Sequence, residues 1–362
     1  MIPARTRKSA SLCAFLVLFL SGCAHVSRPA DSAPPAAPIQ ATEAPPAAQG
    51  ASLALIGDVP YGPSREGAFD RVIDAINQQS QVRVVLHTGD IKNGSERCDD
   101  ALFQRRFAQY QRFQKPFVFT PGDNEWTDCH RPSNGGYVPL ERLNRVRQLF
   151  FPEPGRTTGG RPMAVRSQSQ QAGYETYVEN SLWTVGGAVM ATVHVVGSNN
   201  GLDPWNGIDL QDSATRPRAD RLAEVKAREA AALAWIDQLF DQAESTQAPG
   251  VLVAMQANPN FELAAPHRER QAFNALLAKI TARALAFKKP VVIAHGDSHY
   301  FRIDKPLKAP TKDGSSQMLE NVTRVENFGA QDVHWVEITV DAKDPQVFGF
   351  IPHIIEANRF PR

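Results

Sequence analysis

The chain has no polybasic run and almost no excess of charge of either sign. Its 362 residues include 39 lysines and arginines against 38 aspartates and glutamates, which gives a formal net charge of +1. Proteins that bind nucleic acid through its phosphates carry a basic patch or stripe, and this sequence contains neither pattern. The sequence therefore predicts no nucleic-acid partner.

The N-terminal apolar run is too short to span a bilayer. It covers residues 10–20, follows three basic residues and ends in Leu-Ser-Gly-Cys at positions 20–23. Small residues before a cysteine resemble the lipobox of bacterial lipoproteins, in which that cysteine is lipidated. We therefore expect a lipoprotein signal peptide over residues 1–22 and lipidation of Cys23. The alternative is an ordinary cleaved signal in which Cys23 is incidental.

The segment after the signal lacks the apolar periodicity of a folded core. Residues 23–50 are mostly Ala and Pro, which is typical of a tether, and we expect one large folded domain over residues 51–362. Ala24, rather than Asp, follows the cysteine, and this resembles the signals of outer-membrane lipoproteins. The predicted location is the cell envelope, with the lipid anchor in the outer membrane and the domain facing the periplasm.

Cysteine is scarce, since the chain has only four. Cys13 would leave with the signal and Cys23 would carry the lipid, so Cys98 and Cys129 would remain. An exported protein folds in an oxidising compartment, and each of these two residues follows a Gly-Asp dipeptide by a few positions. We therefore expect a disulfide between Cys98 and Cys129, with two free thiols as the alternative.

Gly-Asp is the recurring feature of this chain, and each copy closes a short run of mostly apolar residues. The runs cover residues 53–56, 82–88, 117–121 and 291–295, each short enough for a buried strand of a parallel or mixed sheet. Ligands of open α/β sheets bind outside the carboxyl ends of the strands. We therefore expect the four aspartates to share one sheet edge as a polycarboxylate cation site. A single Gly-Asp would be explained equally well by turn and helix-cap chemistry.

The remaining pattern predicts alternating helices and strands, with a β-rich C-terminal third. A long polar loop is expected over residues 124–138, and an irregular segment over residues 150–173. The spacing of apolar residues predicts helices over 66–79, 99–114, 218–243 and 268–287, and further strands over 174–179, 188–196, 251–255, 300–303, 333–340 and 347–351.

Taken in order, the four motifs resemble those of the calcineurin-like metallophosphoesterases. The matching residues are Gly57-Asp58, Gly89-Asp90, Gly122-Asp123-Asn124-Glu125 and Gly296-Asp297-Ser298-His299. The resemblance covers residues 52–303 and implies an α/β fold, a four-layer αββα sandwich of two mixed β-sheets. It also implies a site for two metal ions around a bridging aspartate. The metal ligands implied in this chain are Asp58, Asp90, Asp123, Gln256, Asp297 and His299.

Several residues depart from the family pattern at the metal positions. Asp123 stands where the family has Asn, Gln256 follows the strand that elsewhere ends in a metal-binding His, and Asp297 replaces the first His of the last motif. Each change places an oxygen donor in the second metal position, while His299 keeps an imidazole in the first. Oxygen ligands favour hard cations. We expect one or two divalent ions, Mn or Mg, with Ca, Fe and Zn as alternatives.

The resemblance implies hydrolysis of a phosphate ester or anhydride by metal-activated hydroxide attack, on a small phosphorylated substrate. Asn124 replaces the acid–base His of the family, and an amide cannot deliver a proton at neutral pH. We expect His130 to substitute, with His295 as the alternative. Tyr61 replaces the His of the first motif and, with Asn93, is expected to contact the substrate. The alternative function is a non-catalytic relative that binds a metal and a phosphorylated ligand or envelope partner.

Overall fold

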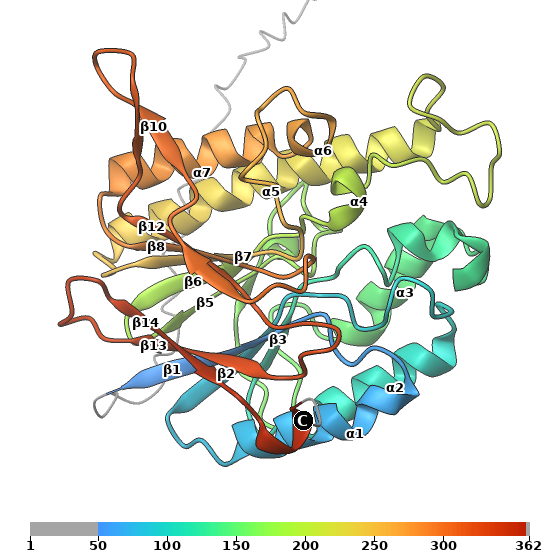
Figure 1. Ribbon diagram of the computed structural model, residues 1–362, viewed down its shortest axis with the longest axis horizontal. Helices are drawn as coiled ribbons and strands as arrows, with labels where there is room; N and C mark the ends of the chain where they lie inside the picture. Colours follow the sequence, from blue (N-terminus) through green and yellow to red (C-terminus); the bar gives the residue numbers. More distant parts are fainter. Residues whose placement is uncertain (1–49, 360–362) are drawn as a thin grey trace, which may run out of the picture. The chain divides into compact units, whose positions relative to one another are not determined.

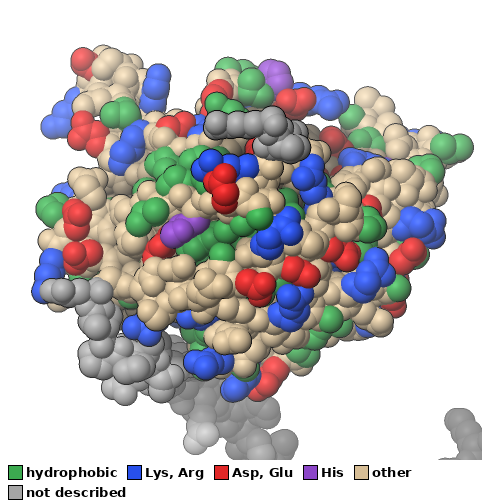
Figure 2. Space-filling model, turned by 60° about the horizontal axis from the view of Figure 1, so that its bottom comes forward, with side chains coloured by type: hydrophobic (Ala, Val, Ile, Leu, Met, Phe, Trp, Pro, Cys, Tyr) green, Lys and Arg blue, Asp and Glu red, His purple; other side chains and the backbone are tan. Residues whose placement is uncertain are grey.

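The computed structural model describes residues 50–359 of the chain. The predicted signal peptide, the lipidation site Cys23 and the predicted tether up to residue 49 lie outside the described residues. None of the described helices combines the length and the apolar composition that a membrane crossing requires. On the face shown in Figure 2, basic and acidic side chains are interspersed.

The first of two large sheets is built around three parallel strands. Its order is β14-β13-β1-β2-β3, in which β13 pairs antiparallel with β1 and β14 antiparallel with β13. The strands are β1 Ala51–Ile56, β2 Val82–His87, β3 Phe117–Phe119, β13 Trp335–Val340 and β14 Phe348–His353. The helices of this half are α1 Pro63–Asn77, α2 Asp100–Tyr110 and α3 Pro139–Phe150.

The second sheet has seven strands in the order β4-β5-β6-β7-β8-β12-β9. The strands are β4 Arg166–Ser167, β5 Ser181–Val185, β6 Ala188–Thr192, β7 Val251–Ala254, β8 Val291–His295, β12 Val322–Glu326 and β9 Arg302–Asp304. The long helices are α5 Ala219–Ser245 and α7 Asn274–Phe287. The short elements are α4 Gly197–Asn200, α6 Arg268–Gln271, the hairpin β10 Lys308–Pro310 with β11 Ser316–Met318, and the 3-10 turns Thr127–His130, Pro132–Asn134, Gln168–Gln170 and Glu356–Asn358.

Figure 1 shows the helices and sheets arranged in four layers, and three of the hydrophobic clusters lie between these layers. In β1, Ala54 and Ile56 face α1 and α2, whereas Leu53 and Leu55 face the second sheet. Strands that are covered on both sides favour apolar residues on both faces, which explains the mostly apolar runs before each Gly-Asp. The third core lies between the second sheet and α5 and α7, with Trp235 fully buried in it. The four-layer αββα sandwich predicted from the sequence is confirmed.

One expectation about the elements was wrong, and two elements were not predicted. Residues 174–179 form turns instead of a strand, and β5 begins only at Ser181. Strand β12 was not predicted because Arg324 and Glu326 interrupt its apolar pattern, yet both are buried through ion pairs. Helix α3 was also missed, although Leu143, Val146 and Phe150 have helical spacing and pack inward.

The expectation of a single shared sheet edge was wrong as well. Strands β1, β2 and β3 belong to the first sheet, but β8 belongs to the second. The fourth Gly-Asp therefore reaches the other three across the interface between the sheets, because both sheets end at the same side of the sandwich.

Candidate metal centre

The four Gly-Asp motifs converge so closely that no side chain fits at their glycines. A Cβ atom on Gly122 would lie 2.0 Å from Asp90 Oδ1, and one on Gly296 would lie 2.2 Å from Asp58 Oδ2. The motifs are also joined directly, because the Asp297 backbone N–H donates to Asp58 Oδ1 at 3.1 Å. At Gly122 and Gly296 the glycine is therefore required by the close approach of a neighbouring carboxylate and not only by turn geometry.

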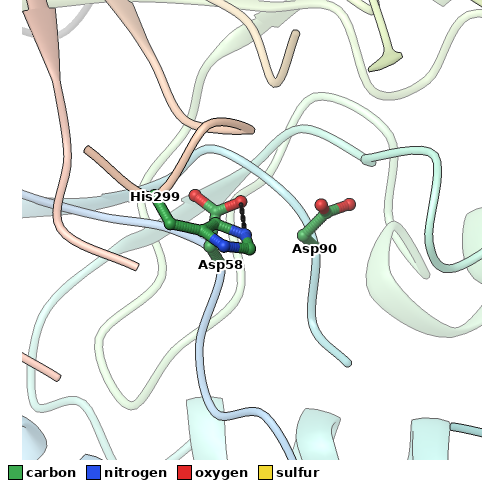
Figure 3. Close-up of side chains that lie close together, drawn as sticks. All are labelled: Asp58, Asp90 and His299. Atoms are coloured by element: carbon green, nitrogen blue, oxygen red, sulfur yellow. Dashed lines mark ion pairs between the residues drawn. The ribbon is translucent and has the colours of Figure 1, made fainter. Parts of the chain in front are cut away.

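One group of possible ligands consists of Asp58, Asp90 and His299, whose ligand atoms all lie within 4.8 Å of one another. Figure 3 shows these side chains, with His299 Nε2 3.4 Å from Asp58 Oδ1. The Tyr61 hydroxyl lies 3.2 Å from both Asp90 Oδ2 and His299 Nε2, and it accepts a hydrogen bond from Asn124 Nδ2 at 3.1 Å. Carboxylates and one imidazole form a donor set that suits a divalent cation.

A second group shares Asp90 and adds Asp123 and Asp297, again with ligand atoms within 4.8 Å of one another. The buried Gln256 side chain reaches all three carboxylates with its amide nitrogen, at 3.2 to 3.4 Å. Its amide oxygen accepts the backbone N–H of Gly197 at 2.6 Å. Gln256 therefore lies where the sequence places it, but its oxygen is turned away from the carboxylates.

A positive charge would stabilise the buried carboxyl groups of the cluster. Burial, and then the charge of Asp123, raise the pKa of Asp90 and of Asp297 well above the ordinary value for a carboxyl group. Burial also raises the pKa of Asp123, and it raises that of Glu125 to about 7. Burial lowers the pKa of His299, but the hydrogen bond with Asp58 and the negative charges of Asp58, Asp297 and Glu326 together outweigh it, so the net shift is upward. A divalent cation among these groups would stabilise the ionised carboxylates, so the residues fit such an ion.

Neither histidine considered as a general acid reaches the four aspartates. His130 Nδ1 accepts the backbone N–H of Gly207 at 3.1 Å, and burial lowers its pKa to about 4. His295 Nδ1 lies 2.8 Å from the Gly296 carbonyl oxygen, and burial lowers its pKa to about 4 as well. Among the described residues, neither ring has a hydrogen bond or ion pair with these aspartates, and both rings are neutral at pH 7.

Asn93 is used locally, and the two cysteines lie behind the site. Asn93 Oδ1 accepts the backbone N–H and the hydroxyl of Ser95, each at 2.8 Å, so it stabilises its own turn.

The predicted disulfide between Cys98 and Cys129 is confirmed. Both sulfur atoms lie 3.6 Å from the carbonyl oxygen of Asn124. The disulfide thus ties the loop after β2 to the loop after β3 directly behind Asn124.

Sequence reasoning missed the residues that orient the ligands. Asn327 follows β12 and donates to Asp58 Oδ2 at 2.9 Å, and its own amide oxygen accepts from the Thr88 hydroxyl at 2.6 Å. Ser198 donates to Asp123 Oδ2 at 2.8 Å. Glu125 was visible as part of the third motif, and it accepts the backbone N–H groups of Gly122 and Asp90. No motif marks Asn327 or Ser198 in the sequence.

The hydrogen bond from Thr88 to Asn327 and the one from Asn327 to Asp58 give a testable prediction. Replacing Thr88 with Val removes the hydroxyl that holds Asn327 and leaves the side-chain volume nearly unchanged. We expect the Thr88→Val variant to bind Mn²⁺ about tenfold to a hundredfold more weakly, the usual effect of losing a group that orients a metal ligand. Thr88→Ser keeps the hydroxyl and serves as the matched control. Titration calorimetry with Mn²⁺ measures both, and equal affinities for Thr88→Val and the wild type would contradict the role of Asn327.

Comparison with known proteins gives one family match. The calcineurin-like phosphoesterase family matches residues 51–301. No curated protein matches the chain significantly.

Several solved structures are similar to it at low identity, including the following three. A purple acid phosphatase from yellow lupin matches with a TM-score of 0.45 and 11% identity, over 88% of this chain and 57% of the other. A phosphopantetheinyl hydrolase from Mycobacterium tuberculosis gives 0.43 and 13%, over 78% and 90%. The Plasmodium inner-membrane-complex anchor GAP50 gives 0.42 and 11%, over 85% and 89%.

Proposed function

The chain belongs to the calcineurin-like phosphoesterase family, and on this basis we propose that it hydrolyses a phosphate ester or anhydride with the help of a divalent cation. The proposal rests on the geometry of Asp58, Asp90 and His299. These side chains lie together at the end of the sandwich, with their ligand atoms within 4.8 Å of one another. The donor set of two carboxylates and one imidazole suits Mn²⁺ or Mg²⁺. A bound divalent cation would polarise a phosphoryl oxygen and lower the pKa of coordinated water.

The residues beside the ligands determine how a substrate can be held. The Tyr61 hydroxyl bridges Asp90, His299 and the Asn124 amide, so it holds the Asn124 side chain beside the ligand group. Asn124 can then donate its second amide hydrogen to a phosphoryl oxygen. On one side of the site, Arg131 pairs with Asp128 at 2.6 Å, and its guanidinium is partly exposed. Its positive charge is available to a phosphate group at the rim of the cluster.

Neither Asn124 nor the two histidines considered as general acids is suited to protonating a leaving group at the cluster. Asn124 has no acidic proton, and His130 is turned toward Gly207. A proton supplied by a general acid typically contributes about a hundredfold to ten-thousandfold to a rate. We therefore propose that the substrates are those whose leaving group departs without protonation, such as phosphoanhydrides and aryl phosphates.

This proposal predicts a strong dependence on the leaving group. We expect kcat/KM for aryl phosphates to exceed that for alkyl phosphates by about a hundredfold or more. Asn124→His restores an imidazole at this position and should raise the rate for alkyl phosphates more than the rate for aryl phosphates. The measurement is a series of phosphate esters with graded leaving-group pKa, assayed with Mn²⁺. An equal rate for aryl and alkyl esters in the wild type would show that another group supplies the proton.

The location we propose is the cell envelope, with a lipid on Cys23. The sequence signals support it, and so does the disulfide between Cys98 and Cys129, because disulfides persist in oxidising compartments. The test is fractionation of cells that express the full chain. We expect the wild type in the membrane fraction and Cys23→Ala in the soluble envelope fraction; recovery of both in the cytosol would overturn the proposal.

The second candidate is a non-catalytic relative that binds a metal and a phosphorylated ligand. The replacement of the acid–base His by Asn124 favours it, and so do the contacts of His130 and His295, whose Nδ1 atoms are taken up by Gly207 and Gly296. A panel of phosphate monoesters, diesters and anhydrides, tested with Mn²⁺ and Mg²⁺, distinguishes the candidates. Turnover of any of them supports the hydrolase, and binding of inorganic phosphate without turnover supports the relative.

A further inference from the structure

The two ligand groups at the site share Asp90 but differ in what lies between their oxygen atoms. In the group of Asp58, Asp90 and His299, the Tyr61 hydroxyl lies 3.2 Å from Asp90 and from His299, but no described side chain donates to all three ligands at once. In the group of Asp90, Asp123 and Asp297, the amide nitrogen of Gln256 does so. The distances are 3.2 Å to Asp90 Oδ2, 3.4 Å to Asp123 Oδ1 and 3.2 Å to Asp297 Oδ1. The amide nitrogen therefore lies at the point toward which the three carboxylates converge.

The orientation of the Gln256 amide is determined by its other end. Gly197 donates its backbone N–H to Gln256 Oε1 at 2.6 Å, and a backbone N–H can only donate. If the amide were turned over, its NH₂ group would face the N–H of Gly197 and its oxygen would face three carboxylates. Both contacts would be repulsive, so this side chain offers donors to the carboxylates and not an oxygen to a cation.

The Gly197 N–H is held in place by the local fold. A Cβ on residue 197 would lie 2.6 Å from Asp123 Oδ2, so the backbone passes directly against the carboxylates. The next residues, Ser198 and Asn199, adopt φ values of 47° and 56°, a conformation that costs free energy for residues with a side chain. The buried Arg228 stabilises this turn by donating to the Asn200 side-chain and backbone oxygens at 2.6 and 2.9 Å. The donor to Gln256 is therefore part of a rigid turn.

Further protein donors reach the carboxylates of this second group. Asp123 accepts from the Ser198 hydroxyl at 2.8 Å, and Asp297 accepts from the Asn258 backbone N–H at 2.9 Å. Hydrogen bonds from Gln256, Ser198 and Asn258 thus provide part of the stabilisation that a second metal ion would provide for these oxygens.

We propose that the protein binds a single divalent cation, at Asp58, Asp90 and His299, and that the Gln256 amide takes the place of a second cation. The inference rests on the proposed function only for the identity of the first site. It explains why the position that holds a second metal in a dinuclear relative carries a side chain with hydrogen-bond donors in this chain.

The experiment measures how many cations the protein holds. The full chain is purified without chelators, equilibrated with Mn²⁺ and freed of excess ion, and its metal content is then determined by elemental analysis. We expect one Mn²⁺ per chain in the wild type and a paramagnetic resonance spectrum of isolated Mn²⁺. Gln256→Glu keeps the side-chain length but replaces the donors by an anionic oxygen, so it should double the content and give a spin-coupled spectrum. Gln346→Glu, at an exposed turn, is the matched control and should keep one ion.

Each outcome bears on the inference. Two coupled ions in the wild type, or no ion at all, would overturn it. A single ion in properly folded Gln256→Glu would also overturn it, and Gln256→His provides the same test if the Glu variant fails to fold. The hydrolase proposal is judged separately from the same samples. One ion without turnover would leave the inference standing and contradict the hydrolase, whereas two ions with turnover would do the reverse.

Discussion

Asp90→Asn is expected to lower kcat/KM for aryl phosphates by about a thousandfold, a loss of transition-state stabilisation of about 4 kcal/mol. Asp90 belongs to both ligand groups and is fully buried between the two sheets. Its oxygens also accept from the Asn124 backbone N–H and from the Tyr61 hydroxyl. A neutral amide at this position removes one ligand charge and disturbs the hydrogen bonds that hold Tyr61 and Asn124.

The measurement is the initial rate with an aryl phosphate over a range of Mn²⁺ concentrations. Asp74→Asn makes the same chemical change on the exposed side of α1 and should leave the rate unchanged. Circular dichroism establishes that both variants fold. If folded Asp90→Asn kept a rate within about tenfold of the wild type, the reaction would not depend on this ligand group, since a tenfold change is only about 1.4 kcal/mol.

Removing the disulfide is expected to lower the free energy of unfolding by about 3 to 4 kcal/mol. Cys98 and Cys129 are 31 residues apart in sequence. Closing a loop of that length lowers the conformational entropy of the unfolded chain, and this stabilises the folded protein by about that free energy. The bond also joins the loop after β2 to the loop after β3, which contains Asn124, so its loss should loosen the backbone at the site. The variant is Cys98→Ala with Cys129→Ala, and urea unfolding measures its stability.

Reduction of the wild type provides the matched comparison, because it opens the same bond without changing the sequence. Reduced wild type should unfold at a lower urea concentration than the oxidised protein, and the reductant should not affect the double variant. Unchanged stability of the double variant would mean that the loops after β2 and β3 are held together without the covalent link.

Oxygen ligands dominate the site, and this affects which metal it selects. In the group of Asp58, Asp90 and His299, two of the three ligands are carboxylates, and His299 is the single imidazole. Hard cations such as Mn²⁺ and Mg²⁺ suit this donor set better than Zn²⁺. Tightly held zinc in protein purified without chelators would contradict this choice of metal.

The elements that lead to the site were predictable because their signals are local. A buried strand that is covered on both faces is mostly apolar, so β1, β2, β3 and β8 appear as short, mostly apolar runs that lead into Gly-Asp. Strand β12 could not be recognised in this way, because Arg324 and Glu326 are buried through partners elsewhere in the chain. Its end carries Asn327, so the residue that orients Asp58 was missed with it.

The sequence by itself determined the family, the two-sheet fold and the disulfide, and it marked the four aspartates as possible ligands. These conclusions depend on short motifs, on their order and on hydrophobic patterns. Only the tertiary structure decided that the fourth aspartate comes from the other sheet, that Asn327 orients Asp58 from 269 residues away, and that Gln256 turns its amide nitrogen toward the carboxylates. The physical reason is that a side chain takes its orientation from its hydrogen-bond partners. For Gln256 that partner is a backbone N–H 59 residues away, which folding alone brings into contact.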